Sequence, residues 1–379
     1  MRRIKMAKFT RRDFSKTLAV SSGIGWLTQL GRASAQPGAG PAAGAGGLTD
    51  VPGIKVGHWT DTRRPTGCTA ILFDPEATAA VDWDGSAPGE QMAVMLTPAS
   101  SVQTIHGMLL TGGGVQALAA VAGAVHYLED RNVGFKWGAP EHPTITPIVI
   151  GAVISDVGIG NGKIRPDPEA AYKACQAAST GPVAEGNVGA GTGATVGKML
   201  PGRHGMKSGL GTASLRLGDV VIAALVVINA VGDIVDWRTG KIVAGARRAD
   251  GSGFANTMET LKRDLAEGKI DASLAISDPP FMSTNLVIVA TNVSYTKTEM
   301  TKIAMMANCG AARAIVPYHT TGDGDQLYAL STNRLKKDVP ISTVGALAGE
   351  VAGNAVLRAI QSATSIPDWP SYQDYTLKL

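Results

Sequence analysis

The sequence predicts an α/β fold in which β-strands pack between layers of helices. Apolar, β-branched runs typical of strands alternate along the chain with longer runs that have a helical period. Aromatic residues make up only 5% of the chain while glycine contributes 47 residues, which indicates a core of small aliphatic side chains joined by tight turns. No internal repeat, charge run or proline-rich linker interrupts residues 48–379, so we expect a single domain there.

The first 35 residues are predicted to be a targeting signal and not part of the fold. Twin arginines lie in TRRDFSK (10–16), an apolar run follows, and Ala33-Ser34-Ala35 provides an A-x-A cleavage site. The apolar run is too short and too broken by Ser and Gly to span a membrane. Residues 36–47 are expected to form a flexible leader. The mature protein is therefore expected in the periplasm, exported by the twin-arginine pathway, with no membrane anchor.

Removing this signal reverses the apparent charge of the protein. The signal holds 8 of the 35 Lys and Arg residues and 1 of the 31 Asp and Glu residues, which leaves 27 basic and 30 acidic residues, a net charge of −3. Nothing in this balance indicates a nucleic-acid partner. Cys68, Cys175 and Cys309 have no C-x-x-C spacing, and their odd number in an exported protein indicates free, buried thiols.

The hydrophobic periodicity assigns secondary structure along the chain. Strand patterns cover 68–73, 107–111, 147–154, 213–217, 220–235, 284–291 and 326–331. Helix patterns cover 115–128, 168–178, 255–266, 297–314 and 344–362. The helix near 297 is expected to begin with a capping box made by Thr296 and Glu299.

Two glycine-rich motifs resemble nucleotide-binding loops without matching them. Gly112-x-Gly114-x-x-Ala117 fits the dinucleotide fingerprint, but the acid required about 20 residues later is missing from the next strand, so we expect only a tight turn. The stretch 189–198, GAGTGATVGK, departs from the phosphate-loop pattern at two positions. Lys198 beside this loop can still serve an active site, because glycines allow close backbone approach.

The histidines give no support for a metal site. None of His58, His106, His126, His142, His204 and His319 forms an H-x-x-x-H or H-E-x-x-H pair, and the chain has no G-x-S-x-G elbow. A metalloenzyme or a common serine hydrolase is therefore unsupported, and no metal or organic cofactor is implied. His58 or His319 could line a pocket, although structural roles are the simpler expectation.

Asp323 and Asp325 form a carboxylate pair just before a predicted strand, in HTTGDGDQLYAL. A calcium loop of the EF-hand type would need an oxygen ligand at position 327, where leucine stands. Two interpretations remain open for this pair. It is either a solvated turn or a pair of carboxylates that orients a nucleophile.

The stretch FMSTNLVIVATN (281–292) begins with small polar residues that follow Pro279-Pro280. Thr284 there is either an ordinary β-former at the entry of a strand or a nucleophile that cuts its own chain. In the second case its hydroxyl attacks the carbonyl of Ser283, and water opens the resulting ester. The product has an N-terminal threonine whose own amine serves as the base.

Several motifs together resemble the L-aminopeptidase/D-esterase family, which includes β-peptidyl aminopeptidases and nylon-oligomer (aminohexanoate-oligomer) endohydrolases. They are LTDVPGIKVGHWTDTRRPTGCTAILF, GSAPGEQ, LTGGGVQAL, GNVGAGTGATVGK, GLGTAS, VVINAVGD, STNLVIVATN and HTTGDGDQLYALST. The resemblance covers about residues 48–365 and is nearest to the oligomer-hydrolase branch, where the nucleophile is also threonine. It implies a four-layer αββα sandwich of the N-terminal-nucleophile-hydrolase type, autoprocessed into chains 36–283 and 284–379.

The resemblance also implies roles for particular residues. Thr284 matches the nucleophile, Asp323 and Asp325 match a pair that orients it, and Lys198 matches a lysine of the same site. Asn229 in VVINAVGD matches the expected oxyanion donor. The sequence departs from relatives at the cut, which follows Ser283 in place of Asn or Gly. It also departs at Ser155, where many relatives carry a substrate-holding tyrosine, and at Gly114, where serine is common.

We therefore expect an exported amide hydrolase that acts on small peptides, β-peptides or aminoalkanoate oligomers. The resemblance implies a homo-oligomer of two-chain units, a tetramer in relatives. One alternative is an acyltransferase on a related self-cleaving scaffold, although export away from cytoplasmic acyl donors argues against it. The other is a non-catalytic periplasmic binding protein that retains the fold.

Overall fold

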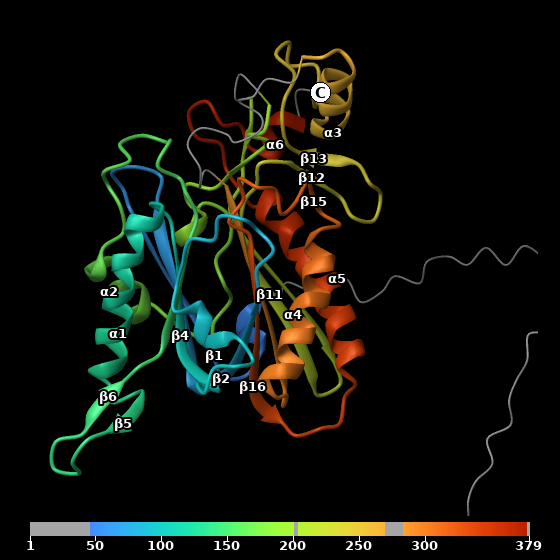
Figure 1. The fold of residues 1–379 in the computed structure, drawn as a ribbon. Coiled ribbons are helices and arrows are strands. Elements are labelled where there is room, and N and C mark those ends of the chain that lie inside the picture. The colour runs from blue at the N-terminus through green and yellow to red at the C-terminus, as the bar shows by residue number, and fades with distance from the viewer. Residues whose placement is uncertain (1–45, 201–203, 270–282, 377–379) are drawn as a thin grey trace, which may run out of the picture. The chain divides into compact units, whose positions relative to one another are not determined.

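The computed structural model describes residues 46–200, 204–269 and 283–376, whose strands and helices are drawn in Figure 1. The predicted signal (1–35) and most of the predicted leader (36–47) lie outside these ranges. None of the helices in the described ranges is long and apolar enough to cross a lipid bilayer.

The described residues contain both classes of secondary structure, as the alternating patterns predict. The strands are β1 (Ile54–Thr60), β2 (Gly67–Asp82), β3 (Glu90–Gln91), β4 (Thr104–Thr111), β5 (Phe135–Trp137), β6 (Thr144–Thr146), β7 (Val149–Val153), β8 (Thr195–Val196), β9 (Met206–Lys207), β10 (Leu210–Leu217), β11 (Val220–Asn229), β12 (Asp233–Val235), β13 (Ile242–Ala244), β14 (Thr284–Val293), β15 (Ile315–Val316) and β16 (Gln326–Leu335). The α-helices are α1 (Val121–Glu129), α2 (Pro168–Gln176), α3 (Thr257–Ala266), α4 (Lys297–Ala311), α5 (Ile341–Gln361) and α6 (Tyr372–Thr376). Short 3₁₀ helices include η3 (Val115–Ala120) and η4 (Gly189–Gly191).

The long strand β2 joins the two halves of the main sheet. Its first part, 67–73, pairs with β1, and its last residues, 78–82, pair with β16. The sheet order is β10-β11-β14-β16-β2-β4-β7-β3, with β1 beside β2. Within this order β14 is central, because it lies antiparallel to β11 on one side and parallel to β16 on the other.

Three apolar clusters show that this sheet is doubled into two stacked layers. The middle cluster takes Leu225 and Ile288 from one half of the sheet and Met108 and Ile150 from the other. A second cluster packs β11, β14 and β16 against α4 and α5, and a third packs β2 and β4 against α1 and α2. The layers therefore run helix, sheet, sheet, helix, which confirms the predicted αββα sandwich (Figure 1).

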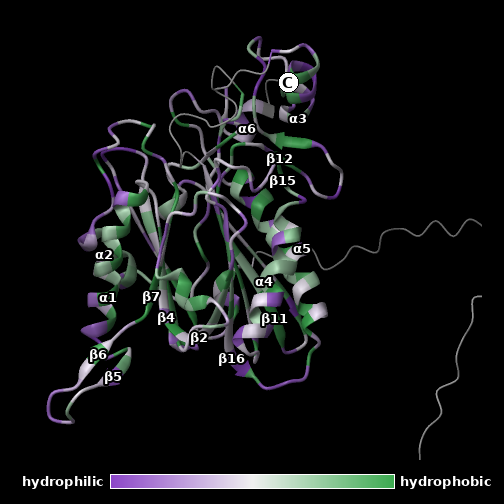
Figure 2. Cartoon of the chain, viewed as in Figure 1, coloured by the Kyte–Doolittle hydropathy of each residue, from purple (hydrophilic) through white to green (hydrophobic). Residues whose placement is uncertain are grey.

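Central strands read as continuous apolar runs because both of their faces are buried. In β11, Leu225 and Val227 belong to the middle cluster, while Val226 between them packs toward α5. Figure 2 shows the same distribution, with hydrophobic residues concentrated on the strands and hydrophilic residues on many surface loops.

Two local expectations are corrected by the structure. The predicted strand 220–235 is two strands, because β11 ends at Asn229 and β12 begins at Asp233 in a separate small sheet with β13 and β15. The three cysteines are free, as predicted, but Cys309 is exposed and only Cys68 and Cys175 are buried.

The capping box of α4 is confirmed, since Thr296 N donates to Glu299 Oε2 at 2.8 Å and Glu299 N donates to Thr296 Oγ1 at 3.3 Å.

Helices α4 and α5 cross at two glycines. A Cβ on Gly310 would lie 2.2 Å from the carbonyl oxygen of Gly349, which no packing adjustment of a side chain can relieve. Replacing Gly310 with alanine is therefore expected to force the helices apart and to lower the free energy of unfolding by roughly 1–3 kcal/mol. The measurement is the fall in melting temperature.

The matched control for this change is Gly349→Ala. A Cβ there meets its nearest atom, Gly310 Cα, at 3.3 Å, so a small adjustment accommodates it. An equal loss of stability in the two variants would contradict the proposed close contact at Gly310.

Candidate active site

Thr284 is the first residue of the central strand β14 and is 4% exposed. Its hydroxyl donates a hydrogen bond of 2.7 Å to the carbonyl oxygen of Ser283, the residue before it. The same carbonyl accepts a second bond of 3.0 Å from the main-chain N–H of Gly324. The carbonyl of the Ser283–Thr284 peptide bond is thus held beside a hydroxyl and polarised by an N–H donor.

Asp323 and Asp325 lie beside Thr284 because β14 and β16 run parallel, so the residues that precede both strands meet at one edge of the sheet. Asp325 Oδ1 accepts bonds from the main-chain and side-chain nitrogens of Asn285, at 2.7 and 2.8 Å. Asp323 Oδ2 accepts bonds from the main-chain nitrogen and hydroxyl of Thr320, at 3.0 and 2.7 Å. Asp323 Oδ1 is buried and has no hydrogen-bond partner among the described residues.

Asn229 reaches the site from the opposite side of β14. It is the last residue of β11, and the antiparallel register places it directly across from Thr284. The side chain of Lys198, from the glycine-rich loop, donates to the carbonyl oxygen and to Oδ1 of Asn229 at 3.0 and 2.7 Å. The Nδ2 atom of Asn229 donates to the carbonyl oxygen of Ser155 at 3.2 Å.

Burial moves the pKa values of Lys198 and Asp323 toward neutral pH. Burial lowers the pKa of Lys198 to about 7, against the opposing pull of nearby carboxylates. Burial, followed by repulsion from Asp325, raises the pKa of Asp323 to about 6, while hydrogen bonds from Thr320 act in the other direction. Such shifts at a cluster of polar side chains are typical of active sites.

The structure therefore brings the sequence-predicted residues together around one peptide bond. Thr284, Ser283, Asp323, Asp325, Asn229 and Lys198 form the cluster, and Ser155 joins it through its main-chain carbonyl. Gly112–Gly114 instead forms a tight turn, as expected, since Gly113 has φ +93° and donates its N–H to Asp156.

The sequence did not single out Asn285 and assigned no catalytic role to His319. Asn285 Oδ1 accepts a bond of 3.0 Å from the main-chain nitrogen of Asn229, so its amide links two parts of the site. His319 Nδ1 lies 3.5 Å from Asp325 Oδ2, and its main-chain nitrogen donates to the same oxygen. The sequence signal that could have placed His319 in the site was its position four residues before Asp323. His58, the other candidate, bonds Thr69 in β2.

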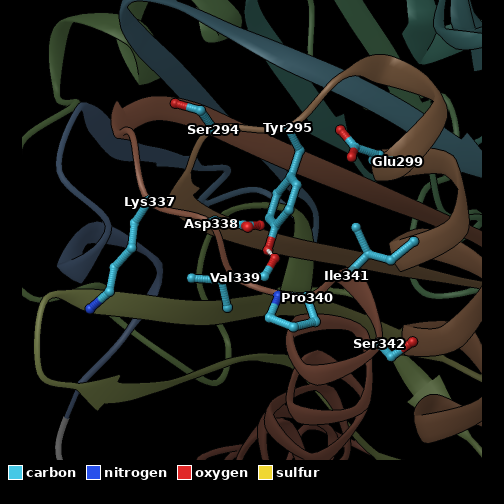
Figure 3. A pocket seen from close by; sticks show the side chains of 9 residues that line it. All are labelled: Ser294, Tyr295, Glu299, Lys337, Asp338, Val339, Pro340, Ile341 and Ser342. Atoms are coloured by element: carbon cyan, nitrogen blue, oxygen red, sulfur yellow. Dashed lines mark hydrogen bonds between the residues drawn. The ribbon is translucent and has the colours of Figure 1, made fainter.

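A pocket at the other end of β14 is separate from this cluster. Figure 3 shows it with Tyr295, whose hydroxyl donates to the carbonyl of Val339 at 2.7 Å. Ser294 and Tyr295 follow the last residue of β14, whereas Thr284 is the first. The pocket therefore plays no part in the chemistry considered for Thr284.

The chain is similar to a peptidase family, to an aminopeptidase and to an oligomer hydrolase. The sequence profile of Peptidase family S58 matches residues 46–369. The chain is 34% identical over 370 residues to an uncharacterized aminopeptidase of Mycobacterium leprae, covering 87% of this chain and 94% of that protein. It is 31% identical over 321 residues to a 6-aminohexanoate-oligomer endohydrolase of Kocuria sp., covering 82% and 84%.

A solved structure supports the fold. The L-aminopeptidase D-Ala-esterase/amidase of Ochrobactrum anthropi, described as a variant of the Ntn-hydrolase fold, matches with a TM-score of 0.59 and 20% identity. The match covers 88% of this chain and 92% of that one. The αββα sandwich of this chain is therefore similar to that variant of the Ntn-hydrolase fold.

The raised pKa of Asp323 predicts a pH dependence of stability. Its contribution is fully present below the unfolded value of 3.8 and is lost as the pH rises through about 6, because the native state holds the proton more tightly. We expect the free energy of unfolding to fall by roughly 2–3 kcal/mol across this interval. Denaturant unfolding of Thr284→Ala protein, chosen to keep one covalent chain, measures it.

Asp323→Asn in the same background should lose this part of the pH dependence, since it removes the titrating group. Asp338→Asn, at an exposed position beyond the other end of β16, is the control. If the free energy of unfolding depended on pH in the same way with and without Asp323→Asn, Asp323 would not be the source of this pH dependence.

Proposed function

The chain belongs to peptidase family S58 and is a hydrolase of amide bonds, and we propose that it cuts itself between Ser283 and Thr284 and then uses Thr284 as its nucleophile. The observation that carries this proposal is the 2.7 Å hydrogen bond from the Thr284 hydroxyl to the carbonyl of Ser283. Proximity of this kind lowers the entropic cost of attack. The cut would give chains 36–283 and 284–379.

The self-cut proceeds in two balanced steps. Thr284 Oγ1 attacks the carbonyl carbon of Ser283, the C–N bond breaks, and the hydroxyl proton passes to the departing nitrogen. Water then opens the ester, which leaves a carboxyl group on Ser283 and restores the hydroxyl of Thr284. The N–H of Gly324, 3.0 Å from the carbonyl oxygen, is placed to stabilise the negative charge that develops there.

In the mature enzyme the freed amine of Thr284 acts as the base. An α-amino group titrates near 7.7–8, well below a lysine side chain near 10.4, so it loses its proton readily around neutral pH. It takes the proton of Oγ1 as the hydroxyl attacks the substrate amide, and passes it to the leaving amine. Water then hydrolyses the acyl-enzyme and regenerates free threonine.

The remaining residues of the cluster orient and stabilise these groups. Asp323 and Asp325 would attract the protonated amine, and their burial strengthens this attraction. Asn229 lies opposite Thr284 in the strand register and supplies an amide donor near the oxyanion. Lys198 holds Asn229 by donating hydrogen bonds to its main-chain and side-chain carbonyl oxygens.

We propose short peptides, β-peptides and aminoalkanoate oligomers as substrates. The names of the relatives support this range, since they include an aminopeptidase and a 6-aminohexanoate-oligomer endohydrolase. Ser155 carries a shorter side chain than the tyrosine expected at this position by resemblance, which leaves more room beside Asn229. Export by the twin-arginine signal to the periplasm and assembly into a homo-oligomer also belong to this proposal.

Intact mass and N-terminal sequencing of the purified protein test the self-cut. We expect two chains, the smaller one beginning Thr-Asn-Leu-Val-Ile. Thr284→Ala should remain a single inactive chain, because it lacks the nucleophile. Thr284→Ser, which retains a hydroxyl, should still be cut. A wild-type chain that stays whole, or an uncut Thr284→Ala protein that hydrolyses amides, would refute the mechanism.

Gly324→Ala is expected to block the self-cut. A Cβ at Gly324 would lie 2.7 Å from Thr284 Oγ1 and 2.4 Å from the carbonyl oxygen of Ala87, so it displaces either the nucleophile or the N–H donor. We expect the rate of chain cleavage to fall at least roughly 100-fold.

The control is Gly158→Ala, since a Cβ there meets no atom within 4 Å. Gel electrophoresis over time after synthesis measures both variants. Cleavage of Gly324→Ala at the wild-type rate would exclude the close approach on which this expectation depends.

A further inference from the structure

Asn285, the residue after Thr284, makes three hydrogen bonds within the site. The proposed mechanism gives it no role. Asn285 is 1% exposed. Its Nδ2 atom and its main-chain nitrogen both donate to Asp325 Oδ1, at 2.8 and 2.7 Å. Its Oδ1 atom accepts the main-chain N–H of Asn229 at 3.0 Å. One side chain therefore connects the carboxylate on one side of β14 with the end of β11 on the other.

Resting on the proposed function, we propose that Asn285 is a positioning residue that anchors the new amino terminus after the self-cut. Before the cut, Thr284 is held from both directions. On its N-terminal side Ser283 is fixed by the N–H of Gly324 and by a parallel bridge to Asp323. After the cut, the covalent link to Ser283 is gone, and Asn285 is the only residue bonded covalently to the nucleophile.

The three hydrogen bonds of Asn285 then fix the position of the Thr284 amine and hydroxyl. They tie the second residue of the small chain to Asp325 and to Asn229, the groups that would orient the amine and stabilise the oxyanion. A displacement of about 1 Å at a reacting group can cost roughly 100-fold in rate. Asn285 therefore matters more for turnover than for the cut itself.

At neutral pH an amide satisfies both neighbours of this side chain. Nδ2 must donate to a carboxylate, while Oδ1 must accept an N–H. An ionised carboxyl group can accept but not donate, and an aliphatic side chain can do neither. An introduced carboxyl would also face Asp325 directly, and two touching carboxyl groups cannot both ionise easily.

The charged and titratable groups around this contact come from several segments. Near Asp325 they are Asp323, His319 and Tyr318 from the segment before β16, and Lys198 from the glycine-rich loop. Because these groups are present in every variant, activities are compared as the ratio of variant to wild type at each pH.

The experiment measures the rate of the self-cut and the kcat and KM of fully cut protein for Asn285→Leu and Asn285→Asp. We expect Asn285→Leu to complete its cut within a few-fold of the wild-type rate. Its kcat should fall roughly 10- to 100-fold while KM changes little, because the loss concerns the alignment of the nucleophile. For Asn285→Asp, the ratio of its kcat to that of wild type should rise as the pH falls from 8 to 5, since a protonated carboxyl can again donate to Asp325.

Asn292→Leu and Asn292→Asp are the matched controls. Asn292 lies in the same strand, is 6% exposed, and also bridges to the chain around β11, with Oδ1 accepting Val221 N at 2.9 Å and Nδ2 donating to Asp219 O at 2.8 Å. It sits at the other end of β14 from Thr284. These variants should share any loss of stability but keep kcat within about twofold of wild type.

Each result decides between the proposals. Uncut or inactive wild-type protein would refute the proposed function itself. If wild type is cut and active, a wild-type kcat in Asn285→Leu, an equal loss in Asn292→Leu, or an uncut Asn285→Leu chain would overturn the anchoring role alone. If Asn285→Leu does not fold, the isosteric Asn285→Asp decides, and a kcat ratio that is flat with pH would overturn the proposal.

Discussion

The parallel pairing of β14 with β16 is the constraint on which the candidate site depends. Parallel strands begin at the same edge of a sheet, so the segment before β16 meets the first residues of β14. This brings Asp325 to Asn285 and Asp323 to Ser283. An antiparallel β16 would place the carboxylates at the other end of a ten-residue strand, about 30 Å away.

The antiparallel neighbour β11 completes this arrangement from the opposite side. It ends where β14 begins, so its last residue, Asn229, lies across from Thr284. Both strands are continuously apolar and are buried between the middle core and the helix layer that includes α5. The position of the site is thus a consequence of how the core packs.

Burial also sets the chemistry of the site. Asp323, Asp325 and Asn229 are all at most 1% exposed. Main-chain N–H groups and side-chain amides compensate the carboxylates, as in the two bonds from Asn285 to Asp325. The remaining cost appears as the raised pKa of Asp323 and the lowered pKa of Lys198, both brought toward the pH range in which proton transfer is useful. Glycine makes the close packing possible, since a Cβ on Gly85 would lie 2.4 Å from Asp325 N.

The sequence by itself determined the α/β class, the capped start of α4 and the strand at 284–291, because periodicity and capping are local properties. The residue types at Thr284 left a β-former and a nucleophile both open, and the resemblance of several motifs to a known family favoured the nucleophile. The sequence also showed the carboxylate pair Asp323 and Asp325. It did not decide whether this pair forms a solvated turn or part of a site. Only the tertiary structure decided that β2 joins two layers, that the run 220–235 breaks after Asn229, and that Asn285 and His319 belong to the site. Asn285 finds its partners 40 and 56 residues away in the chain. Such contacts follow from the order and direction of strands in the sheet, which no local pattern encodes.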